Sequence, residues 1–566
     1  MNMMKFGSFR FLVSVFWVIQ TASAKLKIQT PPPLIKVGHT ERNSVQKGIR
    51  SLETSERPLK IKFHTQALES ALESQDEFTK VKAQAVIDHV LPTISDLWSK
   101  ALSITPSNSN MLVPKDVCYG LYDFPEEWSE SSVGLEDTDL LIFVSSFSSI
   151  ENQNLCEVVT SSTLAVSAPC AIDTNTERPV IGFANICPDS LVSSDGVVDA
   201  ASIREMVDVI SHEVAHILGI NSDLFKFYRN SVTGEPLTSR KRGFLGINGG
   251  GFASTTAKCV DNRPDEKMYM PCSNTIQYRE EEVKFGNAVE KRSYYEVVLP
   301  TVVQVVRNQF NCQRLTGARL ENHPTADDCI GSHFDERQWF SEFMSAIYDK
   351  DSAHLSSLTL AILEDSGWYK VNYEMAENSP FGLGAGCDFV EKDCIVDGFY
   401  SSTRSADAEV HGVVPDYGKG YFCDDVTGDQ WSCGPSRNFR GKCDLNEYEN
   451  PERPYFDPPH IGPSFIHADF CPMVITDTVD CNDTNATKVF ALETFSPNSN
   501  CVDVSVGSTK SAMCLAGFCN HLTHSYAIQM GTKVITCTKD FEVKQVDLNG
   551  FTYRVECPRL TQVCPE

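Results

Sequence analysis

Two histidines and a glutamate form the residue pattern in this chain that is best suited to chemistry: His212-Glu213-Val214-Ala215-His216. Histidines four residues apart lie on one face of a helix, so both imidazoles can bind the same zinc ion. The glutamate between them is then placed to take a proton from a water that the metal activates. The pattern therefore predicts metal-dependent hydrolysis, with zinc as the cofactor.

The residues around this run predict the helix that must hold it. Ser202 to Glu205 matches a capping box, which favours a helix that starts at Ser202. Apolar residues then recur at the helical period and form one stripe: Ile203, Met206, Val207, Ile210, Val214, Ile217 and Leu218. His212 and His216 fall on nearly the opposite side. We therefore expect one face to pack on a core and the other to line a cleft, with Gly219 ending the helix in a left-handed conformation.

There are two alternatives to a metal site for the histidine pair, and the sequence argues against the first of them. Core histidines satisfied by hydrogen bonds would lie within the apolar stripe, and these do not. An ordinary surface helix would expose both rings to solvent. A third ligand elsewhere in the chain would distinguish a metal site from both alternatives.

Strand and helix patterns around the run indicate an α+β fold. Residues 58–63 alternate like a strand, and residues 77–103 follow a helical pattern. Residues 140–144 and 179–184 are apolar enough for buried strands, and 302–310 predict another helix. This order favours a twisted mixed sheet with the active-site helix packed against it.

Composition and charge exclude some classes of partner. The 566 residues are 41% hydrophobic and carry a formal charge of −26, from 49 basic and 75 acidic side chains. Two or three globular domains fit this length. The strong negative charge argues against nucleic acid or an anionic membrane as a partner.

The N-terminal residues predict entry into the secretory pathway. Lys5 and Arg10 supply a positive region, residues 11–19 an apolar stretch, and Ala22-Ser23-Ala24 a cleavage site. The sequence contains no later transmembrane run, no lipid-anchor tail and no ER-retention signal. We therefore expect a secreted or lumenal protein.

The cysteines agree with an oxidising compartment. There are 21, and 13 of them fall from Cys387 onward, which indicates a disulfide-held C-terminal region. The odd number leaves one thiol free or paired with another chain. We expect disulfides to staple the segment after the histidine run through Cys259, Cys272, Cys312 and Cys329. Asn482 and Asn485 lie in acceptor sequons for N-glycans.

The residue pattern alone leaves the third metal ligand open. Zinc hydrolases use three protein ligands and keep one position for water. The residue three positions after Gly219 is Ser222, where the extended form of the motif would have a histidine. The candidates in the same part of the chain are His323, His333 and His354.

A resemblance to a known family favours one of the three. Gly331-Ser332-His333-Phe334, followed by Glu342-Phe343-Met344-Ser345-Ala346, resembles the third-ligand and Met-turn region of leishmanolysin-like zinc metalloproteases, peptidase family M8 of the metzincin clan. Residues 310–312, 320–322 and 360–369 resemble the same family. In this family a long insertion separates the helix motif from the last histidine, and His333 follows His216 by 117 residues.

The resemblance implies a site and a fold. His212, His216 and His333 would bind one zinc ion, Glu213 would be the general base, and Met344 would lie in a turn beneath the metal. The fold would be a metzincin-like catalytic domain followed by a Cys-rich, mostly β or irregular C-terminal domain.

We therefore expect five segments: 1–24, signal peptide; 25–57, flexible arm or short pro-segment; 58–222, N-terminal catalytic subdomain with the zinc helix; 223–383, insertion and central subdomain with the third ligand and the Met-turn; 384–566, Cys-rich C-terminal domain. The expected function is that of a secreted zinc endopeptidase acting on proteins or peptides. The alternative is a catalytically silent adhesion or binding protein on the same scaffold, with surface or glycan contacts through its C-terminal domain. A closed structural zinc site fits poorly, because such sites use four ligands and commonly cysteine.

Overall fold

The computed structural model describes most of the chain from residue 34 onward. The described residues are 34–37, 56–72, 77–107, 109–147, 149–150, 153–154, 164–187, 198–240, 251–260, 263–285, 288–322, 329–349, 353–396, 412–426, 428, 430–448, 456, 461–463 and 466–564. The expected signal peptide and most of the expected arm lie outside them.

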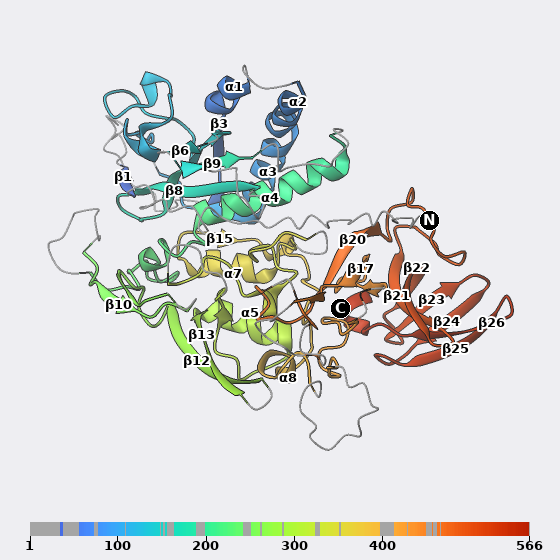
Figure 1. The fold of residues 1–566 in the computed structure, drawn as a ribbon. Coiled ribbons are helices and arrows are strands. Elements are labelled where there is room, and N and C mark those ends of the chain that lie inside the picture. The colour runs from blue at the N-terminus through green and yellow to red at the C-terminus, as the bar shows by residue number, and fades with distance from the viewer. Residues whose placement is uncertain are drawn as a thin grey trace, which may run out of the picture.

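A five-stranded sheet forms the support for the histidine-bearing helix (Figure 1). Its strand order is β1 (Ile35–Val37), β8 (Ala165–Asp173), β9 (Pro179–Ile186), β5 (Leu140–Ser145) and β3 (Ile61–His64). β8 and β9 are antiparallel, whereas the other neighbours are parallel. Every residue of β5 and β9 is buried, as expected of strands covered on both faces. The expected mixed sheet is present, and β8 is a strand that the sequence pattern did not predict.

The histidine run lies in α4 (Ala200–Leu218), which packs on β8 and β9. The helix begins before the expected position, because the side chain of Asp199 accepts a hydrogen bond from the Ser202 amide at 2.8 Å. Asp199 is therefore the cap, and Ser202 lies in the first turn. α4 ends at Gly219 as expected, but the φ of Gly219 is 160° and not left-handed helical. Its missing side chain leaves room for the ring of Trp368, which would lie 3.3 Å from a Cβ.

The second face of α4 is buried among the described residues. Every residue from Val209 to Leu218 is buried. One side faces the sheet, and the other faces the segment 329–347, itself buried throughout except for Ser332. Figure 1 shows α4 between the five-stranded sheet and the central part of the chain.

The N-terminal part contains several further elements. The helical pattern at 77–103 is divided into α2 (Glu77–Ala85), a π-helical turn (Val86–Val90) and α3 (Leu91–Ala101), and it ends in β4 (Leu102–Ile104). The single strand expected at 58–63 is divided into two strands, β2 (Arg57–Pro58) and β3. β3 belongs to the five-stranded sheet, whereas β2 lies in a separate sheet with β4 and β15 (Lys370–Val371). The other elements are α1 (Gln66–Leu72), β6 (Ser149–Ile150), β7 (Gln153–Asn154) and short 3-10 turns at Val117–Gly120 and Glu126–Trp128.

The central part contains the expected helix at 302–310 as α5 (Pro300–Phe310), which packs against α7 (Ser357–Asp365). A long hairpin of β12 (Ile276–Phe285) and β13 (Ala288–Val297) pairs with β14 (Ala318–Arg319). The remaining elements are β10 (Thr255–Ala257), β11 (Glu266–Met268), α6 (Glu336–Trp339), α8 (Cys387–Glu391) and 3-10 turns at Phe225–Phe227 and Tyr373–Met375.

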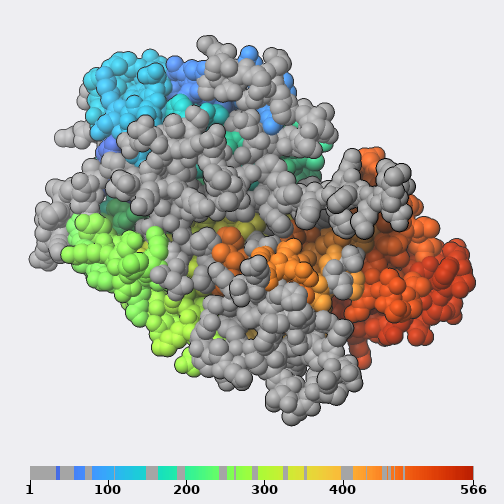
Figure 2. Space-filling model, viewed as in Figure 1, coloured from blue at the N-terminus to red at the C-terminus, as the bar shows by residue number. Residues whose placement is uncertain are grey.

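The last third is mostly β, as expected. A six-stranded antiparallel sheet has the order β24 (Lys533–Cys537), β23 (Ser525–Met530), β22 (Thr509–Asn520), β21 (Ser499–Val506), β26 (Phe551–Glu556) and β25 (Val543–Leu548). Before it lie β16 (Ser432–Cys433), β17 (Phe439–Cys443), β18 (Asn446–Glu447), β19 (Ile461–Gly462) and β20 (Val474–Asp480), and after it lies α9 (Leu560–Val563). Figure 2 shows this sheet, in red, at the opposite end of the visible face from the green β12–β13 region.

Nine disulfides join described cysteines: 118–170, 259–329, 312–387, 394–471, 423–443, 433–501, 481–514, 519–564 and 537–557. Cys259 and Cys329 staple the segment after α4 as expected, but Cys312 pairs with Cys387 in the C-terminal third, and Cys272 is a free thiol. None of the helices in the described part of the chain is long and apolar enough to cross a bilayer.

Gly182 of β9 is predicted to control how closely α4 approaches the sheet. A Cβ at this position would lie 2.5 Å from Cγ2 of Ile217 and 3.0 Å from the Ala168 carbonyl oxygen. Gly182→Ala should therefore destabilise the fold by about 1–3 kcal/mol, measured by urea unfolding. Ile217→Ala removes the Cγ2 atom, so the double variant should lose less stability than the sum of the two single losses. A loss of stability in the double variant equal to the sum of the two single losses would contradict this contact.

Asp208 on α4 provides a prediction on pH. Burial raises the pKa of this carboxyl to about 7, with Glu377 and Glu205 adding to the rise and Arg204 and His354 opposing it. The folded chain thus retains a proton that the unfolded chain loses near pH 4, so folding stability falls as the pH rises from about 4 to 7. Asp208→Asn should raise the melting temperature at pH 8 and leave it nearly unchanged at pH 4. A pH-independent difference would contradict this environment.

Candidate metal centre

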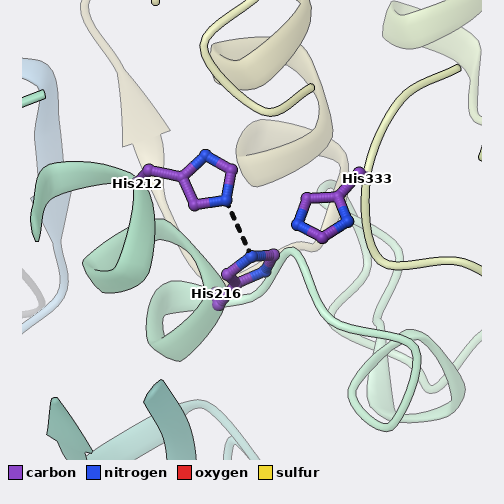
Figure 3. Close-up of side chains that lie close together, drawn as sticks. All are labelled: His212, His216 and His333. Atoms are coloured by element: carbon purple, nitrogen blue, oxygen red, sulfur yellow. Dashed lines mark hydrogen bonds between the residues drawn. The ribbon is translucent and has the colours of Figure 1, made fainter. Parts of the chain in front are cut away.

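Three histidines from two segments that are distant in sequence lie close together at the second face of α4 (Figure 3). His212 and His216 come from α4, and His333 comes from the segment between β14 and α6. One ring nitrogen from each lies within 4.8 Å of the others, and all three residues are buried. Of the remaining candidates, His354 pairs with Glu377 at 3.1 Å, and His323 lies outside the described residues.

Each of the three rings has its Nδ1 atom engaged by a fixed acceptor. The Nδ1 of His212 donates to the Phe343 carbonyl at 2.8 Å, and that of His216 donates to the Ile220 carbonyl at 2.6 Å. The Nδ1 of His333 donates to the carboxylate of Glu321 at 2.8 Å. Carbonyl and ionised carboxylate oxygens accept only, so the hydrogen of each neutral ring is on Nδ1.

The Nε2 atoms are consequently left with lone pairs that point at one another. Those of His212 and His216 are 3.0 Å apart, as the dashed line in Figure 3 marks, and the buried Nε2 of His333 has no hydrogen-bond partner among the described residues. Burial lowers the pKa of both α4 rings, that of His216 to about 3, and the neighbouring histidines lower them further. Nitrogens that bind one zinc at ~2 Å lie ~3.3 Å apart. The donor set and its spacing therefore fit a zinc ion.

Glu321 is a site residue that the sequence pattern did not reveal. Burial acts to raise the pKa of its carboxyl, but His333 and the amide of Ser332 outweigh burial, and the pKa is lowered. An antiparallel bridge between Leu320 and Phe334 places Glu321 opposite His333. Gly331 lacks a side chain where a Cβ would lie 2.2 Å from Cγ of Glu321. The glycine before Ser332-His333 is thus needed to admit this carboxylate.

Ser222, which occupies the position of the missing local histidine, contacts the segment that supplies the distant one. Its amide donates to Oγ of Ser332 at 3.1 Å, and the two hydroxyls lie 3.3 Å apart. The chain after α4 therefore remains beside the third histidine even though 110 residues separate the two serines.

Glu213 lies between the two helical histidines in sequence and is fully buried. Neither of its carboxylate oxygens has a hydrogen-bond partner among the described residues, and burial raises the pKa of the group to about 7 against the opposing effects of Ser167 and His333. The hydroxyl of Ser167 on β8 fixes the backbone here by donating to the Glu213 carbonyl at 2.9 Å. Burial of an ionised carboxylate without a partner costs free energy. The Glu213 carboxyl can therefore accept a proton or form a hydrogen bond with a polar ligand.

Met344 lies in a buried turn that follows α6. The carbonyl of the preceding Phe343 accepts the His212 hydrogen bond, and the carbonyl of Met344 accepts from the Phe334 amide at 2.9 Å, directly after His333. The turn thus contacts His212 of α4 and the backbone of Phe334, which follows His333.

Comparisons with known proteins show which family the chain resembles. The family model for leishmanolysin matches residues 60–243 and 274–566. The chain is 28% identical over 411 residues to a leishmanolysin-like peptidase of Drosophila melanogaster, which covers 67% of this chain and 54% of the relative. Identity to a leishmanolysin-like peptidase of Caenorhabditis elegans is 31% over 266 residues, 47% of this chain and 36% of the relative.

A leishmanolysin homolog of Crithidia fasciculata matches a longer stretch. It is 25% identical over 520 residues, which cover 87% of this chain and 65% of the relative. The matches thus span about half the length of the curated relatives, from 36% to 65% among these three.

Replacement of Glu321 is predicted to weaken metal binding. Because its carboxylate orients His333 and holds the hydrogen on Nδ1, Glu321→Ala should raise the zinc dissociation constant roughly 10- to 100-fold. Competition with a chromogenic chelator measures this constant. Glu377→Ala, which removes the carboxylate paired with His354, serves as the control and should leave it unchanged. Equal affinities for all three proteins would show that Glu321 does not orient a ligand.

Proposed function

This chain belongs to the leishmanolysin family, and on that premise we propose that it is a zinc-dependent endopeptidase that hydrolyses peptide bonds of proteins. The observation that supports the proposal most directly is the convergence of three histidine rings, together with a buried Glu213 whose carboxylate oxygens have no hydrogen-bond partner among the described residues. His212, His216 and His333 would hold the ion, and Glu213 would handle the proton.

The roles of the protein groups follow from their chemistry. When bound, zinc supplies a Lewis acid that polarises the peptide carbonyl and makes water a stronger nucleophile. Glu213 would take the proton of the attacking water and then deliver it to the leaving amine. The Phe343 carbonyl, the Ile220 carbonyl and the Glu321 carboxylate keep the three rings in one tautomer.

The site supports catalysis over the alternative of a silent binding protein. A binding protein has no need of an unpartnered carboxylate at the centre of its core, whereas a peptidase uses one.

We propose further that the protein acts after secretion or in a lumenal compartment, where its disulfides are stable. We also propose that residues 58–222, 223–383 and 384–566 are its three structural units. Met344 would form the apolar floor beneath the ion.

Glu213→Ala separates catalysis from metal binding. The variant should retain close to one zinc per chain, because the three histidines remain. Its kcat/KM on a peptide library should fall by roughly 10²- to 10⁴-fold, because the proton acceptor is lost. Zinc analysis and a fluorogenic peptide assay measure the two quantities. Full activity in this variant would contradict the role of Glu213.

His333→Ala is the matched variant for the metal. It should lose zinc and activity together, and added zinc should restore little of either. Full zinc occupancy in His333→Ala would instead assign the third ligand to another residue.

A further inference from the structure

A second buried carboxylate, that of Glu342, ties the Met344 turn to the start of α7. Its Oε2 accepts a hydrogen bond from the Met344 amide at 3.0 Å. Its Oε1 accepts from the hydroxyls of Ser356 and Thr359 at 2.8 and 2.7 Å, and from the Thr359 amide at 3.3 Å. The residue is completely buried, and no basic side chain pairs with it among the described ion pairs. Both oxygens are thus committed to fixing two segments together.

The turn that Glu342 holds is the common support of two of the three histidines. The Phe343 carbonyl accepts from Nδ1 of His212, and the Met344 carbonyl accepts from the amide of Phe334, the residue after His333. The Phe343 amide in turn donates to the His354 carbonyl at 2.9 Å, which brings the turn alongside the chain that leads to α7. A displacement of this backbone would therefore move acceptors on both sides of the metal centre.

We propose that Glu342 is a positioning residue of the metal centre: its carboxylate anchors the 343–344 backbone to α7 and so sets the orientation of His212 and the placement of His333. This inference rests on the proposed zinc site and adds to it a residue that touches neither the histidines nor Glu213. It assigns the first turn of α7 a part in metal binding through Ser356 and Thr359.

The isosteric variant Glu342→Gln tests the proposal because it keeps the volume and removes one acceptor. If the Gln oxygen faces Ser356 and Thr359, its NH₂ group faces the Met344 amide, and two donors then oppose each other. In the opposite orientation the NH₂ group faces the Thr359 amide, so either orientation weakens the link between the turn and α7.

Asp365→Asn is the matched control, at the opposite end of the same helix. The Asp365 carboxylate is also buried and accepts from the Thr301 amide, the Thr301 hydroxyl and the Val302 amide at 2.7, 2.7 and 3.1 Å. It holds α5 and lies outside the set of residues around the histidines. Asp365→Asn should lower the melting temperature as Glu342→Gln does, but it should leave the contacts of the Met344 turn unchanged.

The measurements are the zinc dissociation constant and the visible spectrum of the cobalt-substituted protein, which depends on ligand geometry. Glu342→Gln should raise the dissociation constant roughly 10- to 100-fold and shift the cobalt bands. Asp365→Asn should leave both unchanged even where it lowers the melting temperature. Should Glu342→Gln fail to fold, Ser356→Ala and Thr359→Val remove the donors on the α7 side and should change both readouts in the same direction.

The outcomes separate this inference from the proposed function. A wild-type chain that takes up neither zinc nor cobalt would overturn both proposals. A wild-type chain that binds one ion, with Glu342→Gln or the α7 variants showing the wild-type affinity and cobalt spectrum, would overturn the positioning role alone. A change in Asp365→Asn equal to that in Glu342→Gln would also overturn it, because the effect would then be one of general stability.

Discussion

The site depends on one electrostatic constraint, the enclosure of three imidazole rings whose Nε2 atoms face each other inside the protein. Without a cation between them, the Nε2 atoms of His212 and His216, 3.0 Å apart, repel each other through their lone pairs and gain nothing from burial. They stay in this arrangement because each Nδ1 hydrogen has an acceptor that cannot turn away: two backbone carbonyls and one buried carboxylate. The surrounding fold supplies those acceptors, and a divalent ion would convert the repulsion into binding.

Much of the site could be predicted from the sequence because its signals are local. The spacing of His212 and His216 gives a shared helix face, and α4 is present with Gly219 at its end. His333 could not be derived from spacing, since 117 residues separate it from His216 and the residue pattern left three histidines open. Only the resemblance of residues 331–334 and 342–346 to the family favoured it, and the structure brings it to the other two.

The remaining features depend on tertiary pairing that a single sequence does not display. Glu321 and Glu342 carry no periodic signal, because the first reaches His333 through an antiparallel bridge and the second reaches α7 across a turn. The segment that covers the second face of α4 was not predicted for the same reason, because it is distant in sequence. The resemblance of residues 320–322 to the family was the one sequence signal that included Glu321. Asp199 was missed as the cap because a capping box three residues later also fits the pattern.

The most direct test is a crystal structure of the zinc-loaded protein with anomalous data collected at the zinc absorption edge. Our account predicts a single strong peak ~2 Å from the Nε2 atoms of His212, His216 and His333, with a carboxylate oxygen of Glu213 near the remaining coordination position. A peak bound to other residues, or His333 turned away from the ion, would contradict it.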